Sequence, residues 1–324
     1  MIKIPFSLRY FVLPLIAVGF ILSGCGNTTK SAKTWEIAPE GVFSAAFSNQ
    51  FVLLGSVDGN AELWDLKRNT QTYSWQHGND RSGGIIAVAI SDNEKYALTA
   101  QRNSLVWWRI RDSRIMGSWN LDSIQSATLS KDGQFALIGL EDRAIYFALR
   151  YGKALFSFEH DGRITSTDLS ADRRYALTGS RDKSAKLWRL SDGRNVHTWP
   201  HRLEIAALAI GPGNRYVLTN EALGSTRLWS VKTGKLEKTI GPERMTLSAA
   251  IFSPNGKYLA TGRTSQGIDL WRIQSGQNIK HWTPKKSSFW RPSASTVLAL
   301  EFTSTGRNLL SATSQGSIQL WNMR

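Results

Sequence analysis

The sequence predicts an all-β fold, a β-propeller of seven blades. Tryptophan-centred segments recur about every 40 residues, alternating strand-like patterns surround each of them, and turns rich in Gly and Asn separate the strands. Units of this length with four short strands are typical of propeller blades. Because these repeats run through most of the 324 residues, we expect one repeat domain instead of two unrelated ones.

Each repeat contains one aromatic anchor near the end of its third strand. The anchors are Trp64, Trp108, Phe147, Trp188, Trp229, Trp271 and Trp321. A tight turn follows most anchors, as at residues 191–194 and 231–235, and leads to a fourth strand with an aromatic residue of its own. Gly and Asn tolerate the positive φ angles of such turns, so the pattern indicates hairpins joined in series.

The ring is predicted to close through a strand at the start of the domain. Residues 33–37, Lys-Thr-Trp-Glu-Ile, match the fourth strand of a repeat, whereas the repeat that contains Trp321 lacks this strand. We therefore expect residues 33–37 to complete the seventh blade, with Trp35 at the position of the fourth-strand aromatic. Closure of this kind removes an unpaired strand edge, which would otherwise be exposed.

The repeats resemble those of the WD40 family. The resemblance lies in the stretches SPNGKYLATG (253–262) and LWDL (63–66), and it covers residues 33–324. The family's Trp-Asp dipeptide occurs once, at Trp64-Asp65, and several blades lack the family's Asp. The fourth repeat, with His160, Thr178 and Asp182, comes closest to the family's internal hydrogen-bond network. The resemblance implies a closed ring that serves as a scaffold for protein binding.

The first 24 residues have the features of a signal peptide. A basic start is followed by twelve uncharged, mostly apolar residues (11–22), which is short for a membrane-spanning helix of about 20 residues. Leu-Ser-Gly-Cys (22–25) then resembles the lipobox of bacterial lipoproteins. The resemblance implies that Cys25 is the mature first residue and carries palmitate or a similar acyl chain. An uncleaved anchor or an incidental cysteine is the alternative.

These features divide the chain into a signal peptide (1–24), a lipidated tether (25–32) and a propeller (33–324). The protein is then expected to be exported and lipid-anchored to a membrane. Gly26 follows the cysteine where inner-membrane lipoproteins often carry Asp. In a Gram-negative cell this favours the outer membrane, with the domain facing the periplasm.

The positive charge of the chain is concentrated on one predicted face. The formal net charge is +15. We define the tether face as the face that residues 26–32 enter, which carries the turns between the first and second and between the third and fourth strands. Its sixteen basic residues are Lys67, Arg68, Lys95, Arg111, Arg114, Lys131, Arg150, Lys153, Arg173, Arg174, Arg194, Arg215, Lys232, Lys235, Lys257 and Arg307. Its six acidic residues are Asp92, Glu94, Asp112, Asp132, Asp172 and Asp192.

The opposite face has nearly balanced charge, with twelve basic and eleven acidic residues. One hypothesis is that the tether face rests on anionic lipid headgroups. The simpler interpretation is that Lys and Arg in turns only increase solubility.

An insertion at residues 283–293 precedes the last repeat and lies on the opposite face. Its candidate partner-binding residues are Lys285, Lys286, Phe289, Trp290 and Arg291. Aromatic and Arg side chains dominate many protein interfaces. Alternatively, Phe289 and Trp290 fold inward and plug the ring, which the tendency of large apolar side chains to be buried favours.

No catalytic, cofactor-binding or metal-binding residues are expected. The HExxH and GxSxG motifs and closely spaced His/Cys sets do not occur in the sequence. The best interpretation is a membrane-anchored WD40-repeat lipoprotein, monomeric by itself, that acts as a protein–protein interaction scaffold in the bacterial cell envelope. Its partners would be envelope proteins and not nucleic acid. The alternative is a propeller enzyme or a small-ligand sensor that uses the central channel.

Overall fold

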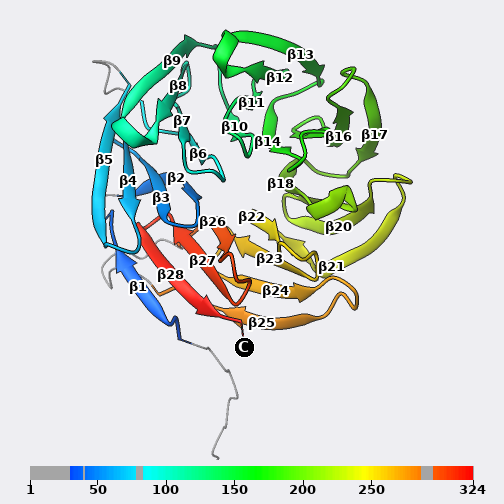
Figure 1. The fold of residues 1–324 in the computed structure, drawn as a ribbon. Coiled ribbons are helices and arrows are strands. Elements are labelled where there is room, and N and C mark those ends of the chain that lie inside the picture. The colour runs from blue at the N-terminus through cyan, green and yellow to red at the C-terminus, as the bar shows by residue number, and fades with distance from the viewer. Residues whose placement is uncertain (1–29, 39–40, 78–82, 286–294, 324) are drawn as a thin grey trace, which may run out of the picture.

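The structure is a computed structural model that describes residues 30–38, 41–77, 83–285 and 295–323. Seven four-stranded antiparallel sheets stand around a central opening (Figure 1). The predicted seven-bladed propeller is therefore confirmed.

The first four blades follow the chain order. Blade 1 consists of β2 (Val42–Phe47), β3 (Phe51–Ser56), β4 (Asn60–Asp65) and β5 (Thr70–Gln76). Blade 2 consists of β6 (Ala87–Ile90), β7 (Tyr96–Ala100), β8 (Ser104–Arg109) and β9 (Arg114–Asn120). Blade 3 consists of β10 (Ser126–Leu129), β11 (Phe135–Gly139), β12 (Arg143–Ala148) and β13 (Lys153–Glu159). Blade 4 consists of β14 (Ile164–Leu169), β15 (Tyr175–Ser180), β16 (Ser184–Arg189) and β17 (Asn195–Pro200).

The last three blades include β1 (Lys33–Glu36), which is the one strand of the described residues that stands out of chain order. Blade 5 consists of β18 (Ile205–Ile210), β19 (Tyr216–Glu221), β20 (Gly224–Ser230) and β21 (Leu236–Met245). Blade 6 consists of β22 (Leu247–Phe252), β23 (Tyr258–Arg263), β24 (Ile268–Arg272) and β25 (Asn278–Trp282). Blade 7 consists of β26 (Val297–Phe302), β27 (Asn308–Thr313), β28 (Ser317–Asn322) and β1 (Lys33–Glu36). Three short 3-10 helices, η1 (Ile110–Asp112), η2 (Leu149–Tyr151) and η3 (Pro212–Asn214), form turns on the tether face.

The core of the ring lies between neighbouring blades. The fourth-strand aromatic of one blade packs against the anchor of the next blade. Trp75 of blade 1 stacks on Trp108 of blade 2, with ring centroids 4.9 Å apart, and Trp282 of blade 6 packs on Trp321 of blade 7 at 5.9 Å. Aromatic pairs at such distances add to the stability from buried area alone. The two aromatics of the repeat are therefore partners across the blade interfaces.

Two local features allow this close packing. In six blades the pairing of the third and fourth strands shifts register at the anchor, as between Leu187 and Trp188, so a β-bulge lies at the anchor's position. Bulges re-aim side chains relative to the regular pleat. In addition, a Cβ atom at Gly179 would lie 2.5 Å from Cγ2 of Ile205 in the next blade. Glycine at this position lets Ile205 approach the backbone of β15.

The predicted closure by an N-terminal strand is also confirmed. β1 pairs antiparallel with β28, from Lys33 opposite Leu320 to Glu36 opposite Ser317 (Figure 1). The Ala32 N–H donates to the Leu320 carbonyl oxygen at 2.7 Å, which extends this pairing by one residue. Trp35 is 8% exposed and belongs to the core cluster between blades 7 and 1. Since β28 ends at the tether face, the chain enters the ring there.

Replacing Trp35 with Ala is expected to destabilise the ring by about 3–5 kcal/mol, because a large buried ring is lost. The Trp35 indole N–H has no hydrogen-bond partner among the described residues, so packing carries this effect. Thermal denaturation of the variant should show a clearly lower Tm, whereas Thr34→Ala, on the exposed side of β1, should change it little. An unchanged Tm for Trp35→Ala would mean that β1 does not hold the ring closed.

Candidate functional site: the two faces and the channel

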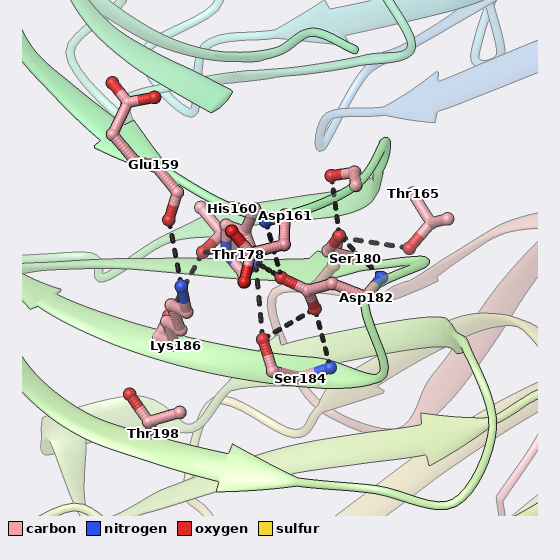
Figure 2. Close-up of polar contacts among 12 residues, drawn as sticks. Glu159, His160, Asp161, Thr165, Thr178, Ser180, Asp182, Ser184, Lys186 and Thr198 are labelled. Atoms are coloured by element: carbon pink, nitrogen blue, oxygen red, sulfur yellow. Dashed lines mark hydrogen bonds and ion pairs between the residues drawn. The ribbon is translucent and has the colours of Figure 1, made fainter. Parts of the chain in front are cut away.

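Blade 4 contains a hydrogen-bond network around His160. The His160 ring lies between Thr178 and Asp182 (Figure 2). Its Nε2 atom is 2.7 Å from Thr178 Oγ1, and its Nδ1 atom is 2.7 Å from Asp182 Oδ2. The anchor Trp188 donates its Nε1–H to Thr178 Oγ1 at 2.9 Å, and Ser184 Oγ donates to Asp182 Oδ1 at 2.7 Å. The network joins the loop after blade 3 to two strands of blade 4.

Other blades repeat this arrangement with different residues. In blade 2, His77 Nε2 lies 2.6 Å from Thr99 Oγ1, which also accepts the Nε1–H of Trp108 at 2.8 Å. In blade 5, Glu221 at the end of β19 takes the place of the Asp and lies 3.0 Å from Nδ1 of His201. All three histidines are linked to the blade that follows them, so they have a structural role.

Burial lowers the pKa of these histidines. Desolvation lowers the pKa of His77 to about 4. Desolvation also lowers the pKa of His160 and His201, although Asp182 and Glu221 act in the opposite direction. The folded ring therefore binds fewer protons at these sites than the unfolded chain, whose histidines titrate near pH 6.5.

The stability that the buried neutral His77 gives is complete above pH 6.5 and should be lost as the pH falls toward 4. The cost of protonation reaches up to about 3 kcal/mol for a shift of this size. Urea denaturation of His77→Gln should give a flatter pH dependence than the wild type over this range. An Asn or Gln replacement of the half-exposed His281 serves as the control. Parallel curves for wild type and His77→Gln would contradict this assignment.

The central channel has a hollow of about 700 Å³ that is lined by the first strands of all seven blades. Alanine is the most frequent residue of its wall, as at Ala46, Ala89 and Ala209. Asp168 and Glu301 occupy the same strand position in blades 4 and 7. Asp168 accepts hydrogen bonds from the Ile210 N–H at 2.7 Å and the Leu169 N–H at 2.8 Å, and so ties blade 4 to blade 5.

Glu301 differs from Asp168 because no described residue donates a hydrogen bond to its carboxylate. Burial and the nearby Asp92 raise the pKa of Glu301 to about 7, although Lys131 opposes them. Burial raises the pKa of Asp168 to about 6 despite its two backbone donors. The channel therefore contains a carboxyl group that titrates near neutral pH.

Glu301 should bind more protons in the folded ring than in the unfolded chain between pH 4.5 and about 7. The folded state therefore loses stability as the pH rises through this window. Glu301→Gln is expected to be more stable than the wild type at pH 8, by up to about 3 kcal/mol, and equally stable at pH 4.5. Urea denaturation at both pH values measures this difference. The exposed Glu237→Gln on β21 is the control, and an equal gain in both variants would contradict the prediction.

The charges on the tether face are unevenly distributed. The turns of blades 2–4 hold nine of its basic residues and all six of its acidic residues, while the turns of blades 5–7 hold five basic residues and no acidic one. Asp132 pairs with Arg173 at 3.3 Å, and Asp92 pairs with Lys131. The five basic turn residues of blades 5–7 and Arg272, the last residue of β24, are all exposed. We call them the basic sector: Arg215, Lys232, Lys235, Lys257, Arg272 and Arg307. None of them forms an ion pair within the described part of the chain.

The opposite face combines ion pairs with exposed apolar side chains. Arg163 pairs with Glu141 at 2.8 Å, and Arg181 pairs with Glu204 at 3.1 Å. The exposed apolar residues on this face are Phe43, Val57, Leu203 and Leu223. Such a mixture of neutralised charge and apolar area is found at protein interfaces.

One of the five candidate partner-binding residues is described by the structure. Lys285 is exposed, and its N–H donates to Gln319 Oε1 at 3.1 Å, which fixes the start of the insertion on the opposite face. Lys286, Phe289, Trp290 and Arg291 lie outside the described residues, as does Cys25.

No group of three or more His, Cys, Asp or Glu side chains among the described residues could hold a metal ion. The helices of the described ranges include none that is long and apolar enough to cross a membrane.

The WD40 family profile, described as WD domain, G-beta repeat, matches residues 152–189 and 285–322. These two segments contain the first three strands of blades 4 and 7, and the seven sheets are consistent with such repeats around the whole ring. The described residues form a seven-bladed β-propeller with WD40 repeats. A WD40 propeller suggests a scaffold for protein–protein interaction.

Several curated proteins are similar to parts of this WD40 propeller. Eukaryotic translation initiation factor 3 subunit I of Eremothecium gossypii is 32% identical over 25% of this chain and 24% of its own length. Pre-mRNA-processing factor 19 of Oryza sativa subsp. japonica is 24% identical over 46% of the chain and 30% of its own length. A guanine nucleotide-binding protein subunit beta of Oryza sativa subsp. indica is 24% identical over 56% of the chain and 51% of its own length. The chain thus spans between a quarter and a half of these relatives.

The WD40 anchors lie at equivalent places in the third strands, and their contacts differ. Four anchors donate the indole N–H to a threonine hydroxyl of the second strand: Trp108, Trp188, Trp229 and Trp271. Trp321 donates its indole N–H to the Ser311 hydroxyl. Trp64 instead donates to Glu62, because blade 1 has Leu54 where the other five blades with a Trp anchor have a hydroxyl. Phe147 has no N–H to donate and packs edge-on against Trp119.

Asp168, Glu301 and Arg272 were not among the residues singled out from the sequence, whereas the other five residues of the basic sector were predicted to lie on the tether face. Asp168 and Glu301 stand at a position of the first strand where four of the other five blades have Ala or Ile, and an alignment of the first strands could have revealed them.

Proposed function

We propose that this WD40 propeller is a lipid-tethered scaffold of the bacterial cell envelope that presents its opposite face to envelope proteins. The observation that carries the proposal is the position of β1. This strand closes the ring and begins at the tether face, so a lipid on Cys25 would hold that face toward the membrane. The opposite face, with its exposed apolar residues, would then point away from the bilayer.

The reach of the tether supports this orientation. Seven residues, 26–32, separate Cys25 from the first residue of β1, and an extended chain spans at most about 3.6 Å per residue. A tether of about 25 Å would keep the ring close to the membrane. In a Gram-negative cell we place the protein on the outer membrane, facing the periplasm.

The insertion is the proposed docking element. Its residue Lys285 lies on the face that carries Phe43 and Val57. Phe289, Trp290 and Arg291 follow within a few residues and have the side chains that contribute most to protein interfaces. We propose no catalytic role and no cofactor besides the covalent lipid.

In-cell photo-crosslinking tests the docking element directly. A photoreactive residue at position 290 is expected to give a discrete adduct with an envelope protein, identified by mass spectrometry. The same probe at position 95, on the tether face, is the control and should give no such adduct. If position 290 gives none, or both positions give the same adduct, the insertion is not the docking site.

Metabolic labelling tests the lipid anchor separately. The wild type should incorporate a clickable fatty acid and fractionate with membranes, and Cys25→Ala should lose the label. Retention of the label in the variant would contradict lipidation at Cys25.

A ligand or metal that copurifies stoichiometrically with the ring would instead favour a sensor or an enzyme acting through the channel.

A further inference from the structure

The basic sector differs from the turns of blades 2–4 on the tether face because its own turns contain no carboxylate. In blades 2–4, the carboxylates of Asp112, Asp132 and Asp192 already pair with neighbouring arginines. In the turns of blades 5–7 there is no carboxylate to pair with. A nearby acidic residue is Glu237, which lies on β21 at the outer rim.

We propose that the basic sector is the part of the ring that docks on an anionic phospholipid bilayer. This inference rests on the proposed membrane tether and specifies which part of the tether face makes contact. The six cations are spread over the turns of three blades instead of lining one groove, which suits a flat anionic surface better than a single acidic peptide. Basic residues near such a surface strengthen binding additively at low salt.

A hollow within the sector provides room for a headgroup. It has a volume of about 300 Å³ and lies between the turns of blades 5 and 6. Pro212, Tyr216, Phe252 and Pro254 form its apolar wall, and Arg215 lies at its edge. The Arg215 guanidinium carbon is 4.9 Å from the centre of the Tyr216 ring, so the cation is held over an aromatic face. A phosphate beside Arg215 and glycerol carbons against the prolines would fit this chemistry.

The chain enters the ring next to the same sector. β1 is the outer strand of blade 7, which carries part of the sector (Figure 1). Lys30 and Lys33 are exposed there and add two positive charges, and the Lys33 ammonium lies 4.4 Å from the centre of the Trp35 ring. A tether that ends at this point would bring blades 5–7 to the bilayer first. The ring is therefore expected to tilt, with blades 2 and 3 farther from the lipid.

Vesicle binding by residues 30–324 tests the proposal without the lipid anchor. This fragment contains all 28 strands and the complete ring. Co-sedimentation is measured with vesicles of phosphatidylcholine alone and with a third of phosphatidylglycerol. The sector variant is Arg215→Glu, Lys257→Glu, Arg307→Glu. The matched variant is Lys95→Glu, Arg150→Glu, Lys153→Glu, which reverses three exposed cations of blades 2 and 3 on the same face that form no ion pair with another described residue.

The wild type is expected to bind the anionic vesicles and not the neutral ones, and to be released by salt. The sector variant should bind about 100-fold more weakly, since it reverses three favourable charges, and the matched variant should lose much less. Thermal denaturation of both variants establishes that they are folded. Equal losses in the two variants would show that only total charge matters and would overturn the proposal.

The same fragment distinguishes a bilayer from an acidic protein. Polyglutamate is added in place of vesicles, and binding is followed by fluorescence anisotropy. Binding to polyglutamate, lost in the sector variant, together with no binding to anionic vesicles would assign the sector to an acidic partner and overturn the bilayer proposal. Because the fragment lacks Cys25, these outcomes do not depend on whether the full chain is lipidated.

Discussion

The pairing of aromatic side chains between neighbouring blades is the constraint on which the rest of the structure depends. A single four-stranded blade cannot bury its own face, so each blade uses its neighbour as a cover. Trp75 covers Trp108, Phe158 covers Trp188, and Trp199 covers Trp229. The fourth strand of each blade covers the anchor of the next blade along the chain. Blade 7 must therefore cover blade 1. Trp35 on β1 supplies the aromatic that blade 7 would otherwise lack, so closure follows from the packing of every other blade.

Closure also makes the two faces chemically different. Because β1 completes blade 7, the chain joins the ring at the tether face and on the edge of the basic sector. Arg163 and Arg181 on the opposite face are paired with carboxylates, and Leu203 and Leu223 are exposed there. One strand therefore connects three properties: the integrity of the ring, the face that a tether holds toward a membrane, and the face left available for protein partners.

The repeat and the closure could be predicted from sequence because both are local patterns that recur. Trp35 was recognisable since its neighbours match a fourth strand, and no knowledge of distant contacts was needed. The pairing of Trp75 with Trp108 was not predictable in this way, because the period shows equivalent positions and not which of them meet. In blade 5, Glu221 contacts His201 in the way that Asp182 contacts His160 in blade 4. Glu221 lies at the end of β19, two residues earlier in the repeat than Asp182, so the equivalence was not visible in the sequence.

The sequence placed Arg215, Lys257 and Arg307 on the tether face, but it did not single out blades 5–7 as a sector without carboxylates. That grouping depends on the order of the blades around the ring. Hydrogen–deuterium exchange on the full protein in membranes, compared with the protein released in detergent, tests the orientation most directly. The account predicts slower exchange in residues 211–216, 253–258 and 303–308 in the membrane, with no change in residues 57–60 of the opposite face. Protection of the opposite face, or equal exchange everywhere, would contradict it.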